Sequence, residues 1–299
     1  MKVLLLGSKG QLGHQLTAEI SPVFNLIDFS RKKLDITDHK KVNETISEID
    51  PDIIINAAAY TNVEEAEMQQ ELAYAINARA VKNIAEISNR LNKWLVHFST
   101  DYVFDGVKHF AYSEKDHPNP VNIYGASKLA GEISITNSNC KHLIFRTSWV
   151  IGAHGKNFAR TILKLAQKQS SLNVINDQFG VPTSTDLIAR VTIDAIKSIE
   201  NNHSWPIGLY NLAPKGSTNW HEVAKQILEI ADWQGLILAA TSENLNPIKS
   251  SEMKQKAKRP KNSQLKLDKL ASKLSFELPD WQTDLHQVTK KIINELSTI

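Results

Sequence analysis

Tyr124 and Lys128 have the residue types and the spacing that suit proton transfer at a carbonyl or hydroxyl oxygen. On a helix, residues four apart lie on one face, one turn from each other. A phenol ionises near pH 10, and a neighbouring ammonium favours its ionised form. Ser99 and Thr100 add hydroxyl groups at the end of an upstream apolar run. We therefore expect Tyr124 to exchange a proton while a hydride moves, with Lys128 assisting. Thr100 would donate to the substrate carbonyl, with Ser99 as a second candidate.

Three glycines, Gly7, Gly10 and Gly13, directly follow the first apolar run and open a helical pattern. Gly7 allows a tight turn, Gly10 lets the backbone approach a pyrophosphate, and Gly13 lets the helix pack closely on the strand. Gln11 and Leu12 would lie in the first turn of the helix, where free N–H groups face phosphate. The spacing G-x-x-G-x-x-G departs from the standard fingerprint, but its place after the first strand favours a dinucleotide site over a plain turn.

The end of the second apolar run bears on the choice of cofactor. An acid there accepts hydrogen bonds from a ribose 2′-OH, whereas a small residue followed by a base accommodates a 2′-phosphate. Asp28 lies at a suitable distance from the glycines, but the strand alternation places the strand end nearer Ser30 and Arg31. This favours NADPH and leaves NADH as the alternative. Further on, Asp35 either meets the adenine amino group or caps a helix.

Apolar runs alternate with helical patterns along the first half of the chain, which predicts a parallel sheet covered by helices on both faces. The predicted strands are residues 2–6, 25–29, 52–56, 94–99 and 142–147, and the predicted helices are 10–20, 40–49, 71–91 and 124–135. In a doubly wound sheet the carboxyl ends of the strands meet at one crevice. The glycines, the small residues of 56–61, Thr100 and Tyr124 should therefore converge.

After about Gly152 the pattern changes. Helices are predicted at 158–167, 186–200 and 221–231, with less regular strands at 170–175 and 209–212. The polar, Lys-rich stretch 241–264 is interpreted as a long loop of the kind that forms a lid. We predict that residues 1–152 mainly form a Rossmann-type dinucleotide-binding domain. Residues 153–299 would mainly form a smaller α/β substrate-binding domain, with some segments returning to the first.

The composition is that of an ordinary soluble protein, with 41% hydrophobic and 22% charged residues among 299. A net charge of +3 with dispersed basic residues does not imply a nucleic-acid partner. The N-terminal apolar run ends at Gly7, too short for a membrane span, and no cleavage pattern follows. The single cysteine, Cys140, excludes an intramolecular disulfide and fits a reducing compartment. We expect a cytoplasmic enzyme without a membrane partner.

Longer strings of residues carry a family resemblance. They are Gly10-Gln11-Leu12-Gly13, Asn56-Ala57-Ala58-Ala59-Tyr60-Thr61, Ser99-Thr100-Asp101-Tyr102-Val103-Phe104, Tyr124-Gly125 with Lys128-Leu129-Ala130-Gly131-Glu132, Arg146-Thr147-Ser148-Trp149-Val150, Asn176-Asp177-Gln178-Phe179-Gly180 with Pro182-Thr183, and Arg259-Pro260 with Ser263 and Leu265. With them the chain resembles the extended short-chain dehydrogenase/reductases and, within these, the dTDP-4-dehydrorhamnose reductase family. The strings follow the family's order over nearly the whole chain. The Tyr/Lys pair marks the superfamily, and the strings beginning at Arg146 and Asp177 are narrower.

The resemblance implies NAD(P)H-dependent reduction of dTDP-4-dehydro-β-L-rhamnose to dTDP-β-L-rhamnose, the last step of dTDP-rhamnose synthesis. Hydride would reach C4 of the sugar, Tyr124 would protonate O4, Thr100 would tune its hydrogen bonding and Lys128 would hold the nicotinamide ribose. The resemblance assigns the cofactor to Gly10 to Leu12, Ser30, Asp35, Ile36, Ala59, Tyr60, Thr61 and Phe98. It assigns the dTDP-sugar to Thr100, Asp101, Trp149, Asp177, Gln178 and Arg259.

Each substrate residue also has a plainer interpretation. Trp149 has a flat ring that suits a sugar face or simply the core. Asp177 and Gln178 either bind substrate or cap a turn. Arg259 offers a planar fork of donors for a diphosphate, but as a lone charge in a Lys-rich loop it would be ordinary.

The sequence also leads to expectations about a bridging metal ion and about the oligomeric state. Some family members form a metal-bridged dimer through acidic residues. Gln15 and Asp186 lie near the corresponding places, and this incomplete acidic set disfavours a bridging Mg²⁺. We expect no metal ligands, and either a monomer or a homodimer.

Two rival functions remain at this point. One is another sugar-nucleotide short-chain enzyme, an epimerase or a 4,6-dehydratase. A dehydratase would want a Glu beside the hydroxyl residue, whereas Asp101 follows Thr100 here. The other is a regulatory subunit of the same fold without turnover, against which the retention of Thr100, Tyr124 and Lys128 argues.

Overall fold

The computed structural model describes residues 1–201 and 205–297. Its main sheet has six parallel strands in the order β10-β5-β4-β3-β1-β2. These strands are β1 (Lys2–Leu6), β2 (Asn25–Phe29), β3 (Ile53–Asn56), β4 (Trp94–Thr100), β5 (Lys141–Thr147) and β10 (Gly208–Leu212). The predicted Rossmann-type parallel sheet is confirmed, and the ends of β1 to β5 agree with the predicted strands to within one residue.

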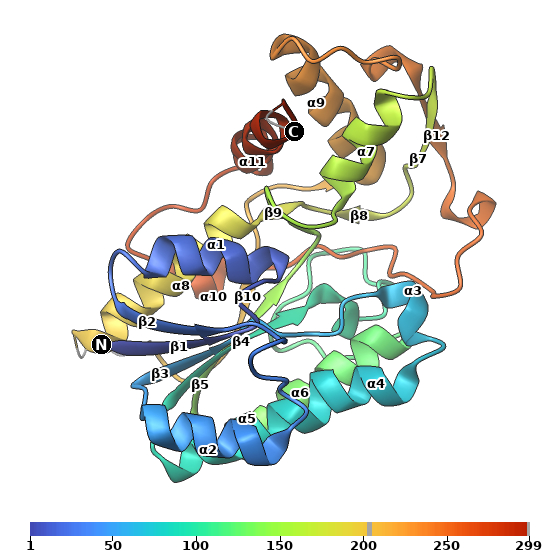
Figure 1. Cartoon of the computed structure of the whole chain (residues 1–299). Coiled ribbons are helices and arrows are strands. Elements are labelled where there is room, and N and C mark those ends of the chain that lie inside the picture. The colour runs from blue at the N-terminus through green and yellow to red at the C-terminus, as the bar shows by residue number, and fades with distance from the viewer. Residues whose placement is uncertain (202–204, 298–299) are drawn as a thin grey trace.

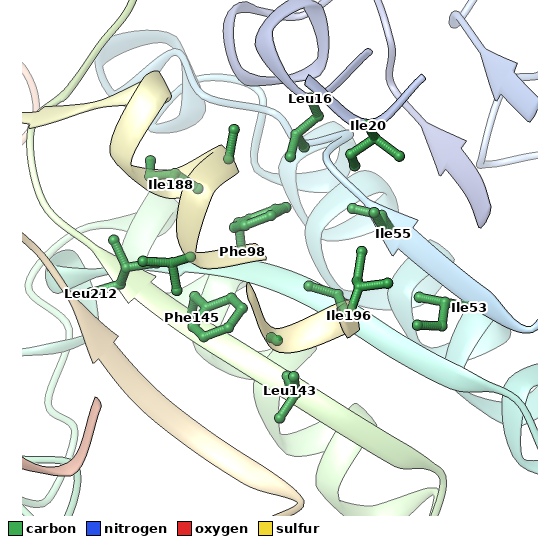
Figure 2. Packing of buried hydrophobic residues seen from close by; sticks show 14 of the residues in the cluster. Leu16, Ile20, Ile53, Ile55, Phe98, Leu143, Phe145, Ile188, Ile196 and Leu212 are labelled. Carbon is green, nitrogen blue, oxygen red and sulfur yellow. The ribbon is translucent and has the colours of Figure 1, made fainter. Parts of the chain in front are cut away.

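Alternation along the strands divides the buried side chains between two faces of this sheet. Val3 and Leu5 belong to one apolar core, which α1 (Gln11–Ile20) and α8 (Thr185–Glu200) cover. Leu4 and Leu6 belong to the other core. The helices α2 (His39–Ile49), α5 (Ala80–Arg90) and α6 (Ile123–Asn137) lie on that second face (Figure 1). Figure 2 shows Leu16 and Ile20 of α1 with Ile188 and Ile196 of α8, near the strand residues Ile55 and Phe98.

The long crossover predicted at 71–91 is not one regular α-helix. It consists of α4 (Gln70–Tyr74), a π-helical turn at Ala75–Arg79 and then α5. Asn77 lies buried within this wide turn. Its side chain accepts a hydrogen bond from the Tyr60 N–H at 2.8 Å and donates to the Ser127 hydroxyl at 3.0 Å. The turn therefore ties the segment after β3 to α6, in keeping with the frequent placement of π-bulges at functional sites.

A third apolar core lies in the C-terminal part of the chain. It is built from α7 (Phe158–Ala166), α9 (Trp220–Trp233), α11 (Trp281–Ser297), β7 (Leu172–Ile175) and β12 (Leu245–Ile248), seen at the top of Figure 1. The stretch 241–264 was predicted to be one long loop. It also contains the strand β12, which pairs in parallel with β7. Pro247 and the polar Asn246 are untypical of a strand, so the sequence pattern does not indicate β12. An edge strand tolerates both residues.

The helix α11 is absent from the predicted elements. Its buried residues Leu285, Val288 and Ile292 recur at helical spacing, a signal that was available in the sequence. The chain also returns to the first sheet after α7, because α8 packs beside α1 and β10 pairs with β5. Among the helices that the structure describes, none is both long enough and apolar enough to cross a membrane.

Candidate active site

A cavity of about 830 Å³ lies at the carboxyl ends of the strands, between the sheet and the C-terminal part. The predicted site residues that line it are Gly10, Gln11, Leu12, Ala59, Thr61, Phe98, Thr100, Asp101, Tyr124, Lys128, Trp149, Gln178 and Arg259. Those outside its lining are Gly7, Gly13, Ser30, Arg31, Asp35, Ile36, Tyr60 and Asp177. The structure thus brings the proposed catalytic group and most of the substrate group into one space.

The glycine turn after β1 has the geometry of a phosphate cradle. Gly7 has a left-handed backbone with φ of 87°, and its N–H donates to the Phe29 carbonyl at 2.8 Å. A Cβ added at Gly13 would lie 2.1 Å from the Gly7 carbonyl oxygen, so only glycine lets α1 approach this closely. Gly10 caps α1 without a side-chain hydrogen bond. The first turn of α1 therefore suits a pyrophosphate.

The residues after β2 lie beside this cradle, because Gly7 bonds to Phe29, the last residue of that strand. Ser30 follows immediately. Arg31 and Asp35 form an exposed ion pair with 3.4 Å between Arg31 Nε and Asp35 Oδ2. The Thr37 N–H donates to Asp35 at 3.0 Å, and this bond lowers the Asp35 pKa. Asp35 thus closes a turn here.

Thr100 and Tyr124 come from different elements and meet in the cavity. Thr100 ends β4, and Tyr124 lies in the first turn of α6, whose cap is Asn122. Burial raises the pKa of Tyr124 to about 12, and a hydrogen bond with Thr100 opposes this rise in part. A phenol with so high a pKa keeps its proton near neutral pH, so it is ready to donate one.

Lys128 lies one turn after Tyr124, and its amine is held by β4. The Lys128 Nζ atom donates to the Phe98 carbonyl at 2.6 Å and lies 3.4 Å from His97 Nε2. Burial lowers the pKa of Lys128 to about 8, although the Glu132 carboxylate opposes this shift. The amine is therefore held against β4, and its pKa of about 8 lies close to neutral pH.

Ser99, the second hydroxyl candidate, has a different task. Its hydroxyl donates to the Glu132 carboxylate on α6. The same carboxylate accepts from Arg146 Nε at 2.9 Å and from Arg146 Nη2 at 2.6 Å, and both side chains of this ion pair are 4% exposed. The pair joins β5 to α6 beneath the cavity and leaves Thr100 as the hydroxyl next to Tyr124.

Asp101 follows Thr100 and is buried. Its Oδ1 atom accepts a hydrogen bond from the Thr100 hydroxyl at 3.1 Å. Burial raises the Asp101 pKa to about 7, against the opposing effect of hydrogen bonds from Ser263 and Thr100. The Thr100 hydroxyl therefore lies between a carboxyl group and the Tyr124 phenol, and connects the two.

The ring of Trp149 is held in place by two neighbours, Trp220 and Gly180. Its backbone is left-handed, with φ of 44°, which is rare for a bulky residue. Its ring stacks on Trp220 with 3.8 Å between the centroids, and a Cβ at Gly180 would lie 2.8 Å from the ring. Trp220, which was not among the predicted site residues, begins α9 just before the predicted helix and lines the same cavity.

Of the remaining substrate candidates, two line the cavity and one does not. Asp177 accepts from the Ser250 N–H at 2.8 Å and from the Ser250 hydroxyl at 3.0 Å, so it holds a turn. Gln178 is buried and lines the cavity. Arg259 also lines it, with 2.8 Å between Arg259 Nη2 and Glu64 Oε1 on α3 (Val63–Ala66). The segment carrying Arg259 thereby folds over the cavity.

Gln15 and Asp186, the two residues considered for a bridging metal ion, lie together in the structure. Gln15 donates to Asp186 at 3.0 Å, and the Lys291 ammonium forms an ion pair with the same carboxylate. Mg²⁺ usually keeps several waters and binds through one or two carboxylates. Here the Asp186 carboxylate is paired with the Lys291 ammonium, and Gln15 also donates to Glu19 at 3.1 Å. Within residues 1–201 and 205–297, no group of three or more His, Cys, Asp or Glu residues could hold a metal ion.

Comparisons with known proteins agree with this geometry. The model of the RmlD substrate binding domain family matches residues 1–294. A dTDP-4-dehydrorhamnose reductase of Salmonella typhimurium is 41% identical over 302 aligned residues, which cover 100% of this chain and 99% of the relative.

Solved structures of similar proteins agree as well. A dTDP-4-dehydrorhamnose reductase of Bacillus anthracis, in complex with NADP, superposes with a TM-score of 0.87 at 35% identity, covering 97% of this chain and 99% of that one. One of Clostridium acetobutylicum superposes with a TM-score of 0.88 at 32% identity, and the match covers 100% of both chains. The chain therefore belongs to the dTDP-4-dehydrorhamnose reductase family of NAD(P)H-dependent oxidoreductases.

Proposed function

We propose that this enzyme reduces dTDP-4-dehydro-β-L-rhamnose to dTDP-β-L-rhamnose, with NADPH preferred and NADH as the alternative donor. The observation that carries the proposal is the meeting of Thr100, Tyr124 and Lys128 with the glycine cradle and Trp149 around one cavity. Residues 1–152 would mainly hold the cofactor. Much of 153–299 would bind the sugar nucleotide.

The cofactor fits the cradle and the small residues after β3. Gly10, Gln11 and Leu12 would face the pyrophosphate, and Ala59 and the neighbouring Tyr60 and Thr61 would lie along the ribose. Ser30 and Arg31 lie beside the cradle, where a 2′-phosphate would sit. When bound, the reduced nicotinamide supplies the hydride that the sugar C4 atom accepts.

Tyr124 would donate its proton to the sugar O4 atom. Its raised pKa, about 12, supports this role because the phenol is protonated across the neutral range. Loss of the proton leaves a phenolate, which a charged Lys128 and the Thr100 hydroxyl would stabilise. Lys128 would also hold the nicotinamide ribose.

The sugar nucleotide would lie between the catalytic residues and the C-terminal part. The fixed ring of Trp149 offers a flat wall for a sugar face. Asp101 and Gln178 supply buried polar groups nearby. Arg259 would meet the diphosphate with its planar fork of donors, and would then exchange its bond to Glu64 for the ligand.

The test is a turnover assay with purified enzyme and dTDP-4-dehydro-β-L-rhamnose, followed at the nicotinamide absorbance band and by chromatography of the product. We expect stoichiometric oxidation of NADPH and formation of dTDP-β-L-rhamnose. An epimerase or dehydratase would change the sugar without net oxidation of the cofactor. A regulatory subunit would bind the cofactor and leave the sugar unchanged, and either result would overturn the proposal.

A further inference from the structure

Three buried polar side chains form a line that starts and ends at the cavity, because Asn56 and Lys128 line it and His97 lies between them. Asn56 ends β3, His97 lies in the middle of β4 and Lys128 lies on α6, with exposures of 1%, 0% and 2%. Asn56 Nδ2 is 3.3 Å from His97 Nδ1, and His97 Nε2 is 3.4 Å from Lys128 Nζ. The imidazole therefore bridges the end of one strand and the catalytic lysine.

The hydrogen bonds of Asn56 determine which nitrogen of His97 carries the proton. The Asn56 Oδ1 atom accepts from the Ala58 N–H at 3.1 Å, which turns the amide nitrogen toward the ring. An amide nitrogen can only donate, so His97 Nδ1 must accept. Burial keeps the His97 pKa well below its usual value, so the ring is neutral. The single ring proton is thus on Nε2.

This tautomer points an N–H group at Lys128. An ammonium has three donors and no acceptor, whereas an uncharged amine has a lone pair that can accept. The N–H of His97 therefore complements the amine and opposes the ammonium. The Phe98 carbonyl, 2.6 Å from Lys128 Nζ, accepts equally from either form and does not distinguish them.

We propose that His97, held in one tautomer by Asn56, is a positioning residue that directs its ring N–H at Lys128 and so narrows the pH range in which Lys128 is charged. The consequence for catalysis rests on the proposed function, in which the charge of Lys128 stabilises the Tyr124 phenolate.

Other ionisable groups also lie around Lys128. Glu132, on the same helix, favours the charged form of Lys128, but its carboxylate is shared with Arg146 of β5. Tyr124 on α6 and Asp101 after β4 line the same cavity, and so do the charged residues Glu64, Lys156 and Arg259. With the pKa of Lys128 at about 8, a single hydrogen bond suffices to move its charge into or out of the neutral range.

The first test reads the tautomer directly. Nitrogen-15 NMR of histidine-labelled protein distinguishes Nδ1–H from Nε2–H, and loss of a signal in His97→Phe assigns the resonance. We expect Nε2–H in the wild type. In Asn56→Asp both oxygens at position 56 accept, so the ring should switch to Nδ1–H. A wild-type ring protonated on Nδ1 would overturn the proposal, and in that measurement His97→Phe serves only to assign the signal.

The second test titrates Lys128 by carbon-13 NMR of labelled lysine, with Lys128→Met to assign the signal. Asn56→Asp should raise the Lys128 pKa by about one unit, a tenfold change in its protonation constant. The new carboxylate also acts through space, so the same substitution is made in His97→Phe, where the rise should be clearly smaller. Equal rises in both backgrounds would show that the ring does not transmit the effect.

These readouts do not depend on turnover. Should the enzyme fail to reduce the dTDP-sugar while the tautomer and the titrations behave as expected, the proposed function fails and the role of His97 stands. Should turnover occur with the alkaline limb of kcat/KM unmoved in Asn56→Asp, the role of His97 in catalysis fails alone.

Discussion

The rings of Trp149 and Trp220 stack with 3.8 Å between their centroids and 16° between their planes, although 70 positions separate them in the chain. Gly180 also lies against the Trp149 ring, so closely that an added Cβ would be 2.8 Å from it. The indole that we propose as the wall of the sugar site is thus held in one position by a second aromatic ring and a glycine.

We predict that Gly180→Ala raises KM for the dTDP-sugar more than it lowers kcat. The new methyl group would lie 2.8 Å from the Trp149 ring, and Trp220 prevents the ring from moving away. The overpacking should also cost on the order of 1–3 kcal/mol of folding stability. Steady-state kinetics test the change in KM, with Gly235→Ala as the control. Gly235 has no atom within 4 Å of an added Cβ, although its φ of 75° lowers stability. Unchanged KM in Gly180→Ala would remove Trp149 from the sugar site.

Tyr124→Phe should lower kcat by about 10²- to 10⁴-fold while the affinity for NADPH stays near the wild-type value, because the phenol transfers a proton and does not anchor the cofactor. Stopped-flow kinetics and fluorescence titration of the cofactor measure the two effects. Tyr112→Phe is the matched control, since its hydroxyl donates to Asp105 outside the cavity. Retained turnover in Tyr124→Phe would contradict its role as proton donor.

For cofactor choice, Arg31→Ala should weaken NADPH binding about tenfold and NADH binding little, because only NADPH carries the 2′-phosphate. The exposed Arg31 has only a 3.4 Å ion pair with Asp35 to give up. Isothermal titration with both cofactors measures the difference, and Arg79→Ala, on the crossover helix, controls for the loss of a surface arginine. Equal weakening of both cofactors would argue against a contact with the 2′-phosphate.

Arg146→Leu should destabilise the enzyme by roughly 3–5 kcal/mol, because it leaves the Glu132 carboxylate buried without its partner. Urea unfolding measures this loss. In Arg79→Leu, which breaks an exposed ion pair with Glu71, the loss should stay below about 1 kcal/mol. Similar losses in the two variants would mean that the buried pair has no special structural role.

Burial of Lys128 should cost stability at neutral pH. Its pKa is lowered from 10.5 to about 8, so between these values the unfolded chain binds more protons than the folded one. Stability from this group therefore rises with pH across that window and is lowest below pH 8. Lys128→Met should be inactive yet more stable at pH 7, by up to about 3 kcal/mol, with the gain shrinking toward pH 10. Thermal unfolding at pH 7 and pH 10 tests the sign. A gain that does not depend on pH would contradict this account.

Local spacing was enough to predict the sheet and the placement of Tyr124 and Lys128 on one helix. Glycines after an apolar run define a strand-to-helix turn, and Tyr124 and Lys128 lie on one face of α6 by helical geometry alone. The wrongly predicted regions have local causes too. The π-helical turn around Asn77 preserves an apolar helical pattern, and Pro247 in β12 contradicts strand propensity until β7 pairs with it.

The sequence by itself thus determined the fold class, the phosphate cradle and the Tyr124–Lys128 pair, because each depends on residues close together in the chain. Only the tertiary structure showed that the Ser99 hydroxyl donates to Glu132 and that Asp177 holds a turn. It also showed that Trp220 stacks on Trp149 and that His97 lies next to Lys128. Those roles depend on burial and on hydrogen-bond partners from other strands and helices. No periodicity or spacing within one segment records which partners folding will bring together.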